Sequence, residues 1–374
     1  MAIDSSKAAS QQAKSRYYAP MTRPTRFLIH LDRLVRNCAK ARQLHGGRIL
    51  AVIKANAYGH GDVACAQALQ SSADGFAVAT LDEALHLRQA GLSGPIVLLE
   101  GVFAAAEMAE VVAHQLTPVI HHAEQIKGLS GLKPNQKLDV WLKVDTGMHR
   151  LGVAPEECST AFEALRASAH VSSITLMTHF ANADGADAQA LIMPMQRFKN
   201  ATQGLTAPIS LCNSGAILGH SEVRGDWARP GLMLYGIDPG APDVAPRGDL
   251  ERVMTLESAI CAVRTIALGE SVGYGGVFRA QRTTRVGVIP CGYADGYPRS
   301  AAQGTPIAVM GHSAPLIGRV SMDMLMVDLS DLPQVGLGAA VELWGDQVPV
   351  EQVAQGAGTV AYELLCNAKR APRI

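Results

Sequence analysis

The sequence predicts an α/β protein: an N-terminal (β/α)8 barrel of the TIM type, followed by a C-terminal domain built mainly of β-strands. Eight short apolar runs alternate with amphipathic segments between residues 49 and 229, which is the order typical of this barrel. Prolines and glycines then cluster between Gly236 and Gly248 and indicate a linker. Beyond the linker the apolar runs are short, partly β-branched and separated by glycine and proline, as in antiparallel β-sheets.

The barrel strands are predicted from unbroken apolar runs, which suit strands that are buried on both faces. Thr80 with Glu83 three residues later forms a capping box, so a helix should begin there and end at Gly91. A second helix should begin at Pro155 and reach about Ala167. The predicted strands are Ile49–Ile53, Gly75–Ala79, Ile96–Leu99, Thr117–Ile120, Leu138–Val144, Ile174–Thr178, Ile209–Leu211 and Asp226–Arg229.

These elements predict three regions of the chain. Residues 1–24 form a flexible extension, residues 25–245 the barrel, and residues 246–374 the β-rich domain. One helix is expected in the last region, near Val350–Gln355. The strands predicted there are Ser258–Ile266, Arg285–Ile289, Ile307–Met310, Leu316–Val320, Met324–Leu329 and Ala340–Leu343.

Composition excludes several classes of protein. The chain has 374 residues, 48% of them apolar, with 33 basic and 33 acidic residues and no basic block, so nucleic acid and anionic membranes are not expected partners. No apolar run approaches the ~18 residues needed to span a bilayer, and the N-terminal residues lack the apolar centre of a signal peptide. Seven cysteines without a C-x-x-C pair favour reduced thiols, a cytoplasmic location and no metal site.

Lys54 ends the first predicted strand, where ligands collect in parallel α/β proteins. An amine at this place is either a solvated side chain at a strand end or a Schiff-base lysine whose neutral form is favoured by its surroundings. Tyr58 adds a hydroxyl in the same turn. Lys54 alone does not decide between these two interpretations.

Polar side chains follow other predicted strands and should converge on the same rim of the barrel. Taken singly, His179 suits a hydrogen-bonded core histidine, Asn213 and Ser214 an ordinary turn, and Arg229 a surface ion pair. Their convergence on one rim favours a functional site. The rim residues are Lys54, Lys143, Asp145, His179, Asn213, Ser214 and Arg229.

The stretch after the eighth strand adds a candidate phosphate site. Pro230 and Gly231 should leave bare backbone N–H groups at a helix N-terminus, which is a favourable place for an anion. Barrels commonly bind phosphate after their seventh and eighth strands, and Ser214 follows the seventh. A phosphate site, a candidate Schiff-base lysine and Arg229 together indicate pyridoxal 5′-phosphate, which would stabilise a carbanion.

Five motifs in the same order resemble those of bacterial alanine racemases, and the resemblance extends from about Arg26 to Arg373. It implies a homodimer that interconverts L- and D-alanine, for peptidoglycan or for alanine catabolism. The motifs are Ala51–Gly61 (AVIKANAYGHG), Lys143–Gly152 (KVDTGMHRLG), Trp227–Gly236 (WARPGLMLYG), Val272–Gly275 (VGYG) and Gly318–Asp323 (GRVSMD).

The resemblance also implies the residue roles. Lys54 would hold the cofactor and act as the base toward D-alanine, and Tyr274 of the partner subunit would act on the opposite face. Arg150 and the backbone of Met322 would orient the substrate carboxylate, and Lys143 matches a position that is carbamylated in some members. The residues that would hold the cofactor phosphate are Tyr58, Ser214, Gly231, Leu232 and Tyr362, while His179, Asn213 and Arg229 would position the ring.

Two bases on opposite faces of the α-carbon suit racemisation, and Tyr274 would need a nearby cation because phenols titrate near ~10. An arginine such as Arg229 stays protonated, so replacing it with glutamate should increase transamination relative to racemisation. Several family members carry histidine where this chain has Ser210, which puts a ring contact there in question. The alternatives are a broader amino-acid racemase, an amino-acid decarboxylase and a pyridoxal-phosphate carrier protein.

Overall fold

The computed structural model describes residues 23–185, 187, 189–240 and 247–374. They divide into two compact units. The barrel unit spans Ile29–Met254, and the sheet unit combines the N-terminal residues up to Leu28 with Thr255–Ile374. Most of the predicted extension, residues 1–22, and the centre of the predicted linker, residues 241–246, lie outside the described residues.

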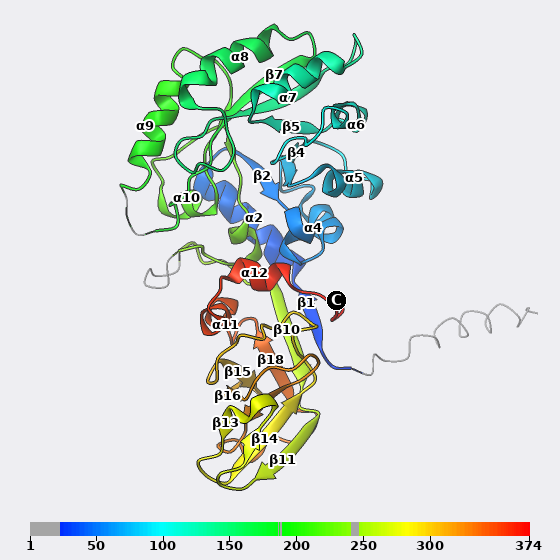
Figure 1. Ribbon diagram of the computed structural model, residues 1–374, viewed down its shortest axis with the longest axis vertical. Coiled ribbons are helices and arrows are strands. Elements are labelled where there is room, and N and C mark those ends of the chain that lie inside the picture. The colour runs from blue at the N-terminus through cyan, green and yellow to red at the C-terminus, as the bar shows by residue number, and fades with distance from the viewer. Residues whose placement is uncertain (1–22, 186, 188, 241–246) are drawn as a thin grey trace, which may run out of the picture. The chain divides into compact units, whose positions relative to one another are not determined.

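The barrel unit confirms the predicted fold class. Eight parallel strands form a closed barrel, and β2 pairs with both β3 and β9 to close the ring through Arg48↔Trp227 and Ile49↔Ala228. Helices cover the outside of the strands (Figure 1). The strands are β2 (Arg48–Val52), β3 (Gly75–Val78), β4 (Ile96–Leu98), β5 (Thr117–Ile120), β6 (Leu138–Lys143), β7 (Val171–Met177), β8 (Ile209–Ser210) and β9 (Trp227–Ala228).

The helices of this unit bury one stripe each. In α8, the buried residues are Cys158, Ala161, Phe162 and Leu165, at the spacing of one helical face. The first turn after Pro155 is a 3-10 helix (Pro155–Glu157) that leads into α8. The α-helices are α2 (Leu31–His45), α3 (Lys54–Tyr58), α4 (Asp62–Leu69), α5 (Leu81–Gln89), α6 (Glu107–Ala113), α7 (Ala123–Gly128), α8 (Cys158–Ala167), α9 (Ile192–Ala201) and α10 (Ser214–Gly219).

The sheet unit contains the predicted antiparallel strands. Its eight-stranded sheet has the order β1-β10-β18-β15-β16-β17-β14-β11, and β12 and β13 form a separate hairpin. The helices are α11 (Val350–Ala357) and α12 (Ala361–Cys366). The strands are β1 (Arg26–Ile29), β10 (Met254–Ala259), β11 (Ala262–Ile266), β12 (Ser271–Val272), β13 (Phe278–Arg279), β14 (Thr284–Ile289), β15 (Pro306–Val309), β16 (His312–Ile317), β17 (Leu325–Asp328) and β18 (Ala340–Trp344).

One predicted strand is two strands in the structure. The run Ser258–Ile266 breaks at Ile260 and Cys261, because β10 pairs with β18 while β11 pairs with β14. The two intervening N–H groups bond to carbonyls on different sides, Ile260 to Ala339 and Cys261 to Val288, both at 2.9 Å. A run of apolar residues does not indicate the point at which the neighbouring, hydrogen-bonded strand changes.

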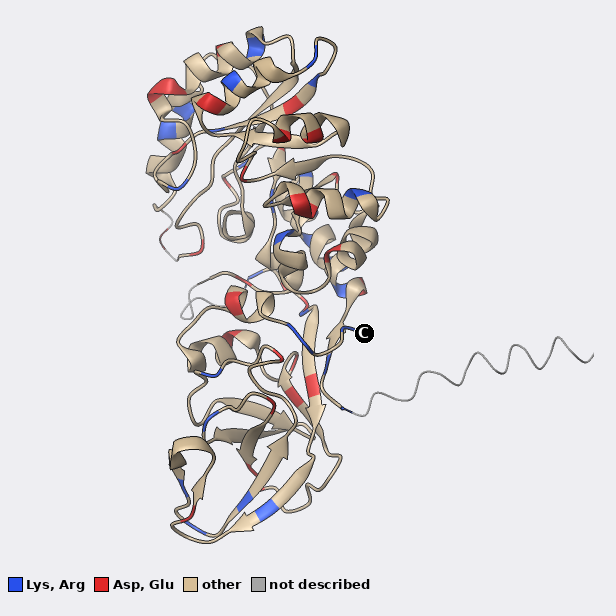
Figure 2. Cartoon of the chain, turned by 45° about the vertical axis from the view of Figure 1, so that its right-hand side comes forward, with Lys and Arg blue, Asp and Glu red and all other residues tan. Residues whose placement is uncertain are grey.

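Charged side chains of both signs are scattered over each unit (Figure 2). No helix among the described residues is both long enough and apolar enough to cross a membrane.

Candidate active site

Lys54 lies directly after β2 and precedes an unusual turn. Ala55, Asn56, Ala57 and Tyr58 all have left-handed backbone conformations, with φ of 54°, 54°, 51° and 51°. Gly59 continues the positive φ at 79°. L-residues visit this conformation singly, at a cost of about 1–2 kcal/mol each. A run of four therefore needs support from its surroundings.

Tyr58, Ser214 and Gly231 are brought together from three different loops of the barrel unit. The Gly231 N–H donates to the Ser214 hydroxyl at 2.9 Å, and the Met233 N–H approaches the same oxygen at 3.3 Å. A Cβ atom at position 231 would lie 2.7 Å from the Tyr58 hydroxyl. Glycine is required there, since any side chain would displace the phenol.

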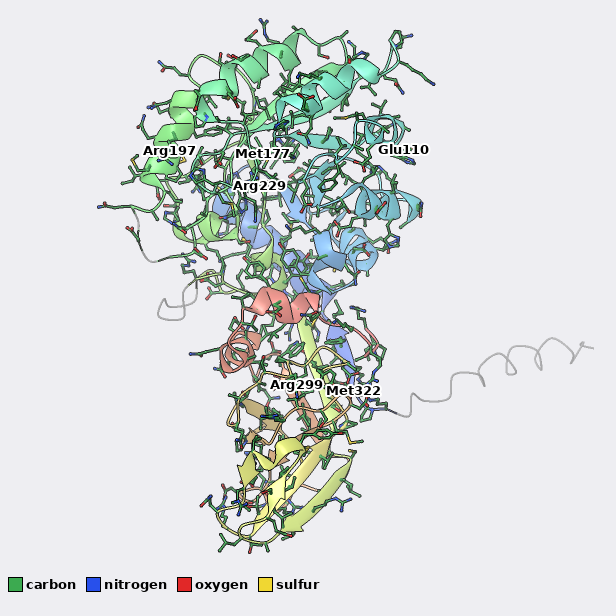
Figure 3. The ribbon with its side chains drawn as sticks, in the orientation of Figure 1. Glu110, Met177, Arg197, Arg229, Arg299 and Met322 are labelled. Carbon is green, nitrogen blue, oxygen red and sulfur yellow. The ribbon has the colours of Figure 1, made fainter. Side chains whose placement is uncertain are left out.

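Arg229 is buried inside the barrel (Figure 3) and donates hydrogen bonds to three neutral oxygens. One guanidinium nitrogen donates to the Ser210 hydroxyl at 2.5 Å, and the other to the carbonyls of Thr178 at 2.6 Å and Leu211 at 3.3 Å. Burial lowers the pKa of Arg229 to about 10, so the side chain keeps its charge at neutral pH. Ser210 thus contacts this arginine.

Positive charge is concentrated around the end of β6. Burial, together with the charges of Arg150 and Arg229, lowers the pKa of the Lys143 amine to about 8. Burial and the same cations hold the pKa of His179 well below its usual range, so this imidazole is neutral at physiological pH. Lys54 contributes to both shifts. These electrostatic interactions show that the ionisable rim residues Lys54, Lys143, Asp145, His179 and Arg229 share one neighbourhood with Arg150.

Arg150 is carried by a loop that folds back onto the end of β6. Asp145 accepts from the N–H groups of Gly147 and His149, both at 3.0 Å, and its second oxygen lies 3.1 Å from the His149 ring. Gly152 has a φ of 135°, and a Cβ there would lie 2.5 Å from the Asp145 nitrogen. The loop before Arg150 is therefore fixed by a local hydrogen-bonded turn.

The side chain of Asn213 makes two hydrogen bonds to backbone groups of the same chain. Its amide oxygen accepts from the Ala216 N–H at 3.1 Å and caps α10, and its amide nitrogen donates to the Phe180 carbonyl at 3.2 Å. Both interactions fix the helix that begins with Ser214.

Three predicted site residues belong to the sheet unit: Tyr274, Met322 and Tyr362. All are exposed in this chain, Tyr274 by 72% and Met322 by 53%. Tyr274 follows β12 in the β12–β13 hairpin, and Tyr362 lies in α12.

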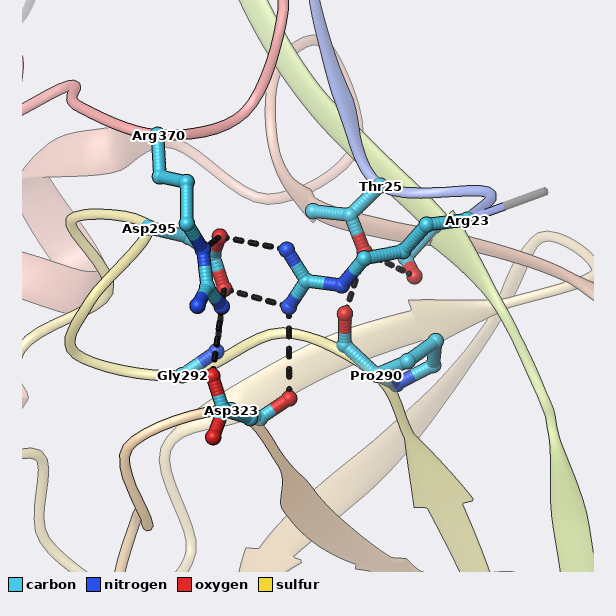
Figure 4. A network of polar contacts seen from close by, with 8 residues as sticks. Arg23, Thr25, Pro290, Gly292, Asp295, Asp323 and Arg370 are labelled. Carbon is cyan, nitrogen blue, oxygen red and sulfur yellow. Dashed lines mark hydrogen bonds and ion pairs between the residues drawn. The ribbon is translucent and has the colours of Figure 1, made fainter. Parts of the chain in front are cut away.

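The loop with Met322 is held by a network of polar contacts (Figure 4). Gly292 approaches it so closely that a Cβ would lie 2.4 Å from the Met322 carbonyl, and the Ala294 N–H donates to that carbonyl at 3.0 Å. The next residue, Asp295, is fully buried and accepts two hydrogen bonds from Arg23, at 2.6 and 2.7 Å.

Arg370 extends this network to the Met322 loop itself. It bonds to Asp295 at 3.0 and 3.3 Å and to the Asp323 carboxylate at 2.7 Å. Burial alone would raise the pKa of Asp295, but hydrogen bonds from the two arginines outweigh it, so this pKa lies below its ordinary value. Arg23, placed in the predicted flexible extension, is thus tied to the sheet unit.

Sequence reasoning did not find three residues that support the site: Glu83, Ser210 and Asp295. Glu83 was predicted only as a helix cap, yet it also accepts from the Ala55 N–H at 2.7 Å. Asp295 lies in the segment Gly292–Tyr297, whose two glycines, Gly292 and Gly296, could have indicated a closely packed turn. Ser210 carries no signal of its own, because its partner is 19 residues away.

Two family profiles cover nearly the whole chain. The profile described as "Alanine racemase, N-terminal domain" matches residues 29–239, and "Alanine racemase, C-terminal domain" matches residues 253–374. The chain belongs to the alanine racemase family.

Individual members of the alanine racemase family agree with this assignment. The chain is 57% identical to an alanine racemase of Azoarcus over 93% of its length and 98% of that protein. The biosynthetic alanine racemase of Pseudomonas aeruginosa superimposes with a TM-score of 0.91 at 43% identity, covering 94% of this chain and 99% of that one. The Bartonella henselae enzyme, solved with covalently bound pyridoxal phosphate, gives a TM-score of 0.85 at 32% identity, with coverages of 94% and 99%.

Proposed function

We propose that the protein is an alanine racemase, which interconverts L- and D-alanine with pyridoxal 5′-phosphate as cofactor and acts as a homodimer. The observation that carries the proposal is the neighbourhood of Lys54, Lys143, Arg150, His179 and Arg229 at the barrel rim. Family membership over nearly the full chain identifies alanine as the expected substrate.

The residues at the rim fit this cofactor. The rim holds four cationic side chains, of Lys54, Lys143, Arg150 and Arg229, and Asp145 is the acidic residue that partly offsets the charges around Lys143. A phosphate dianion would relieve the repulsion among these cations. Lys54 would hold the cofactor covalently, and Arg229 would face its ring nitrogen. Tyr58, Ser214, Gly231, Leu232 and Tyr362 would hold the phosphate.

His179 and Asn213 would complete the ring's environment in different ways. A neutral His179 can pack against an aromatic ring without adding charge. Asn213 would act indirectly, since its side chain caps the helix that begins at Ser214.

When bound, the cofactor would store the electron pair left behind when the α-carbon loses its proton. The chain's own side chains would move that proton. The Lys54 amine would exchange it on the face of D-alanine, and the phenol of Tyr274 from a second copy would exchange it on the face of L-alanine. The 72% exposure of Tyr274 in a single chain supports its use by a partner.

Two further groups would orient the substrate. Arg150 would pair with the carboxylate of alanine, and the backbone of Met322 would approach the same group. Arg229, with a pKa of about 10, would stay protonated and keep the ring nitrogen from gaining a proton. A weaker electron sink should favour return of the proton to the α-carbon over side reactions such as transamination.

Lys143 would carry a carbamate. Only a neutral amine adds carbon dioxide, and a pKa of about 8 leaves a substantial neutral fraction near physiological pH. The modification would also exchange a buried positive charge for a negative one beside Arg150 and Arg229. A carbamate signal in the 13C spectrum under labelled bicarbonate, absent from a Lys143→Met variant, is the expected result.

Racemisation is tested on the purified dimeric protein with a panel of L-amino acids. L-alanine should lose its optical activity and exchange its α-proton in deuterium oxide, whereas Lys54→Ala should abolish both. Reduction with borohydride should bleach the yellow protein and attach the cofactor to a peptide containing Lys54. A yellow protein that leaves every amino acid unchanged would contradict the proposal, and carbon dioxide release would indicate a decarboxylase.

The physiological direction stays a prediction. The product would be D-alanine for peptidoglycan or L-alanine for catabolism, in the cytoplasm as the cysteine content suggests.

A further inference from the structure

The left-handed turn after Lys54 is the most strained backbone in the described barrel unit. Four consecutive non-glycine residues, Ala55–Tyr58, have positive φ, and at about 1–2 kcal/mol each the cost is several kcal/mol. Such a conformation persists only where surrounding contacts impose it. Because Lys54 directly precedes the turn, the place of its Cα depends on those contacts.

Some of the support comes from within the turn. The Ala57 N–H donates to the Ile53 carbonyl at 2.8 Å, and the Gly59 N–H donates to the Ala55 carbonyl at 3.0 Å. These bonds keep the turn's shape, but they do not fix where the turn lies relative to the rest of the rim.

Glu83 supplies a tie to the neighbouring strand. One carboxylate oxygen accepts from the Ala55 N–H at 2.7 Å. The other accepts from the Ala79 N–H at 2.7 Å, directly after β3, and from the Thr80 N–H at 3.4 Å. The capping contact to Thr80 is thus the longest of the three. The two shorter bonds join the loop after β2 to the loop after β3.

Only a carboxylate can make this bridge. All three partners are N–H donors, so both side-chain oxygens must accept, and an ionised glutamate has acceptors alone. Glutamine offers one oxygen and one NH2 group. Its NH2 group would have to face a backbone N–H, which removes one side of the bridge at almost unchanged volume.

We propose that Glu83 is a positioning residue for Lys54: it holds the strained turn against β3, so that the amine reaches one face of the substrate α-carbon. The inference rests on the proposed racemisation, in which Lys54 serves the face of D-alanine. Loss of the bridge should therefore slow one proton transfer more than the other.

The chain offers a matched control in Glu107. It opens α6, the helix after β4, and one of its oxygens accepts from the N–H groups of Phe103 at 2.8 Å and Ala104 at 3.4 Å. Glu107→Gln thus perturbs a similar helix start that, among the described residues, makes no hydrogen bond to the Lys54 turn. A general loss of stability should affect both variants, whereas loss of positioning should affect Glu83→Gln alone.

The first measurement needs neither cofactor nor substrate. Hydrogen exchange of a peptide covering residues 50–62, in the cofactor-free protein, should be at least about tenfold faster in Glu83→Gln than in wild type or Glu107→Gln. The second uses the loaded enzyme. Its kcat should fall about 10- to 100-fold in Glu83→Gln, with KM changed less than kcat.

The decisive measurement compares α-deuterated substrates. The kinetic isotope effect should rise with D-alanine, whose proton Lys54 removes, and stay near the wild-type value with L-alanine. Equal isotope effects in both directions, or equal exchange rates in the two glutamine variants, would overturn the positioning role. A wild-type protein that racemises nothing would refute the proposed function instead, and the exchange experiment would still test the bridge.

Discussion

Two loops that carry predicted site residues are each secured by one carboxylate, but by different chemistry. In the barrel unit, Glu83 accepts hydrogen bonds from three backbone N–H groups. In the sheet unit, Asp295 accepts from Arg23, Arg370 and the Gly292 N–H, the last at 2.9 Å. Both carboxylates make hydrogen bonds to residues far away in the sequence. These bonds fix the position of a loop that its local sequence does not determine.

The difference follows from the charge around each loop. The barrel rim already holds Lys54, Lys143, Arg150 and Arg229, so a further arginine beside Lys54 would add repulsion. A carboxylate that bonds to backbone N–H groups holds the turn without bringing another cation. At the loop with Met322, two carboxylates, Asp295 and Asp323, balance the charges of Arg23 and Arg370, so arginines can brace the loop there.

Removing the carboxylate from the arginine network should have the largest effect on stability. Asp295→Asn would leave Arg23 and Arg370 without a full countercharge. Breaking a buried pair costs about 3–5 kcal/mol, and the lower end applies here because both arginines are partly exposed. The measurement is hydrogen exchange of sheet-unit peptides across a urea series. Asp331→Asn, which breaks the exposed pair with Arg282 in the same unit, should change stability by less than about 1 kcal/mol. Similar losses of stability in both variants would show that the buried Asp295 carboxylate stabilises the protein no more than an exposed ion pair does.

The stability of both units should fall as the pH falls, but in different pH ranges. The pKa of Lys143 is lowered from 10.5 to about 8, so the unfolded state binds more protons between these values and the free energy of unfolding should rise across that range. Relative to Lys143→Met in carbon-dioxide-free buffer, the gain is about 3 kcal/mol. It is measured by barrel-unit hydrogen exchange at pH 7.5 to 10.5.

Asp295 gives the same sign, but in the acidic range. Its pKa is lowered below 3.8, so its contribution is present above that value and is lost as the pH falls through the folded-state pKa. If the free energy of unfolding of the barrel unit did not rise in alkaline buffer relative to that of Lys143→Met, the proposed crowding of cations at the rim would be refuted.

The smallest effect should come from Ser210, which gives the buried Arg229 a neutral acceptor. Ser210→Ala removes a hydrogen bond to a charged group and should lower barrel stability by about 1.5–3 kcal/mol. Ser173→Ala, which removes an exposed hydroxyl bonded to Asp139 at 2.6 Å, is the control and should cost less. Equal costs would mean that the oxygens of Thr178 and Leu211 suffice for Arg229.

Much of the fold was predictable because its signals are local. The eight barrel strands were placed within three residues at each end, since each is an apolar run ended by polar or turn-forming residues. β1 and α12 were missed because Arg26–Ile29 and Ala361–Cys366 are too short for a period to show. β1 forms because it is hydrogen-bonded to β10, a strand that lies far away in the sequence.

In the candidate site, the backbone conformation and the supporting contacts were not predictable from the sequence. The motif around Lys54 named the lysine and Tyr58, but nothing in Ala-Asn-Ala-Tyr predicts four left-handed residues, since alanine has no preference for positive φ. That conformation is imposed by contacts such as the bond from Ala55 to Glu83. Tertiary contacts of this kind are invisible to patterns that extend over a few residues.

Closure of the barrel has a consequence for synthesis on the ribosome. β2 completes the ring by pairing with β9, and Arg48 and Trp227 are 227 − 48 = 179 residues apart. At about 5–20 residues per second, β9 emerges roughly 9 to 36 s after β2. During that interval the nascent chain holds Lys54 next to an unpaired, apolar strand edge. The growing polypeptide therefore needs shielding from aggregation before it can retain any cofactor.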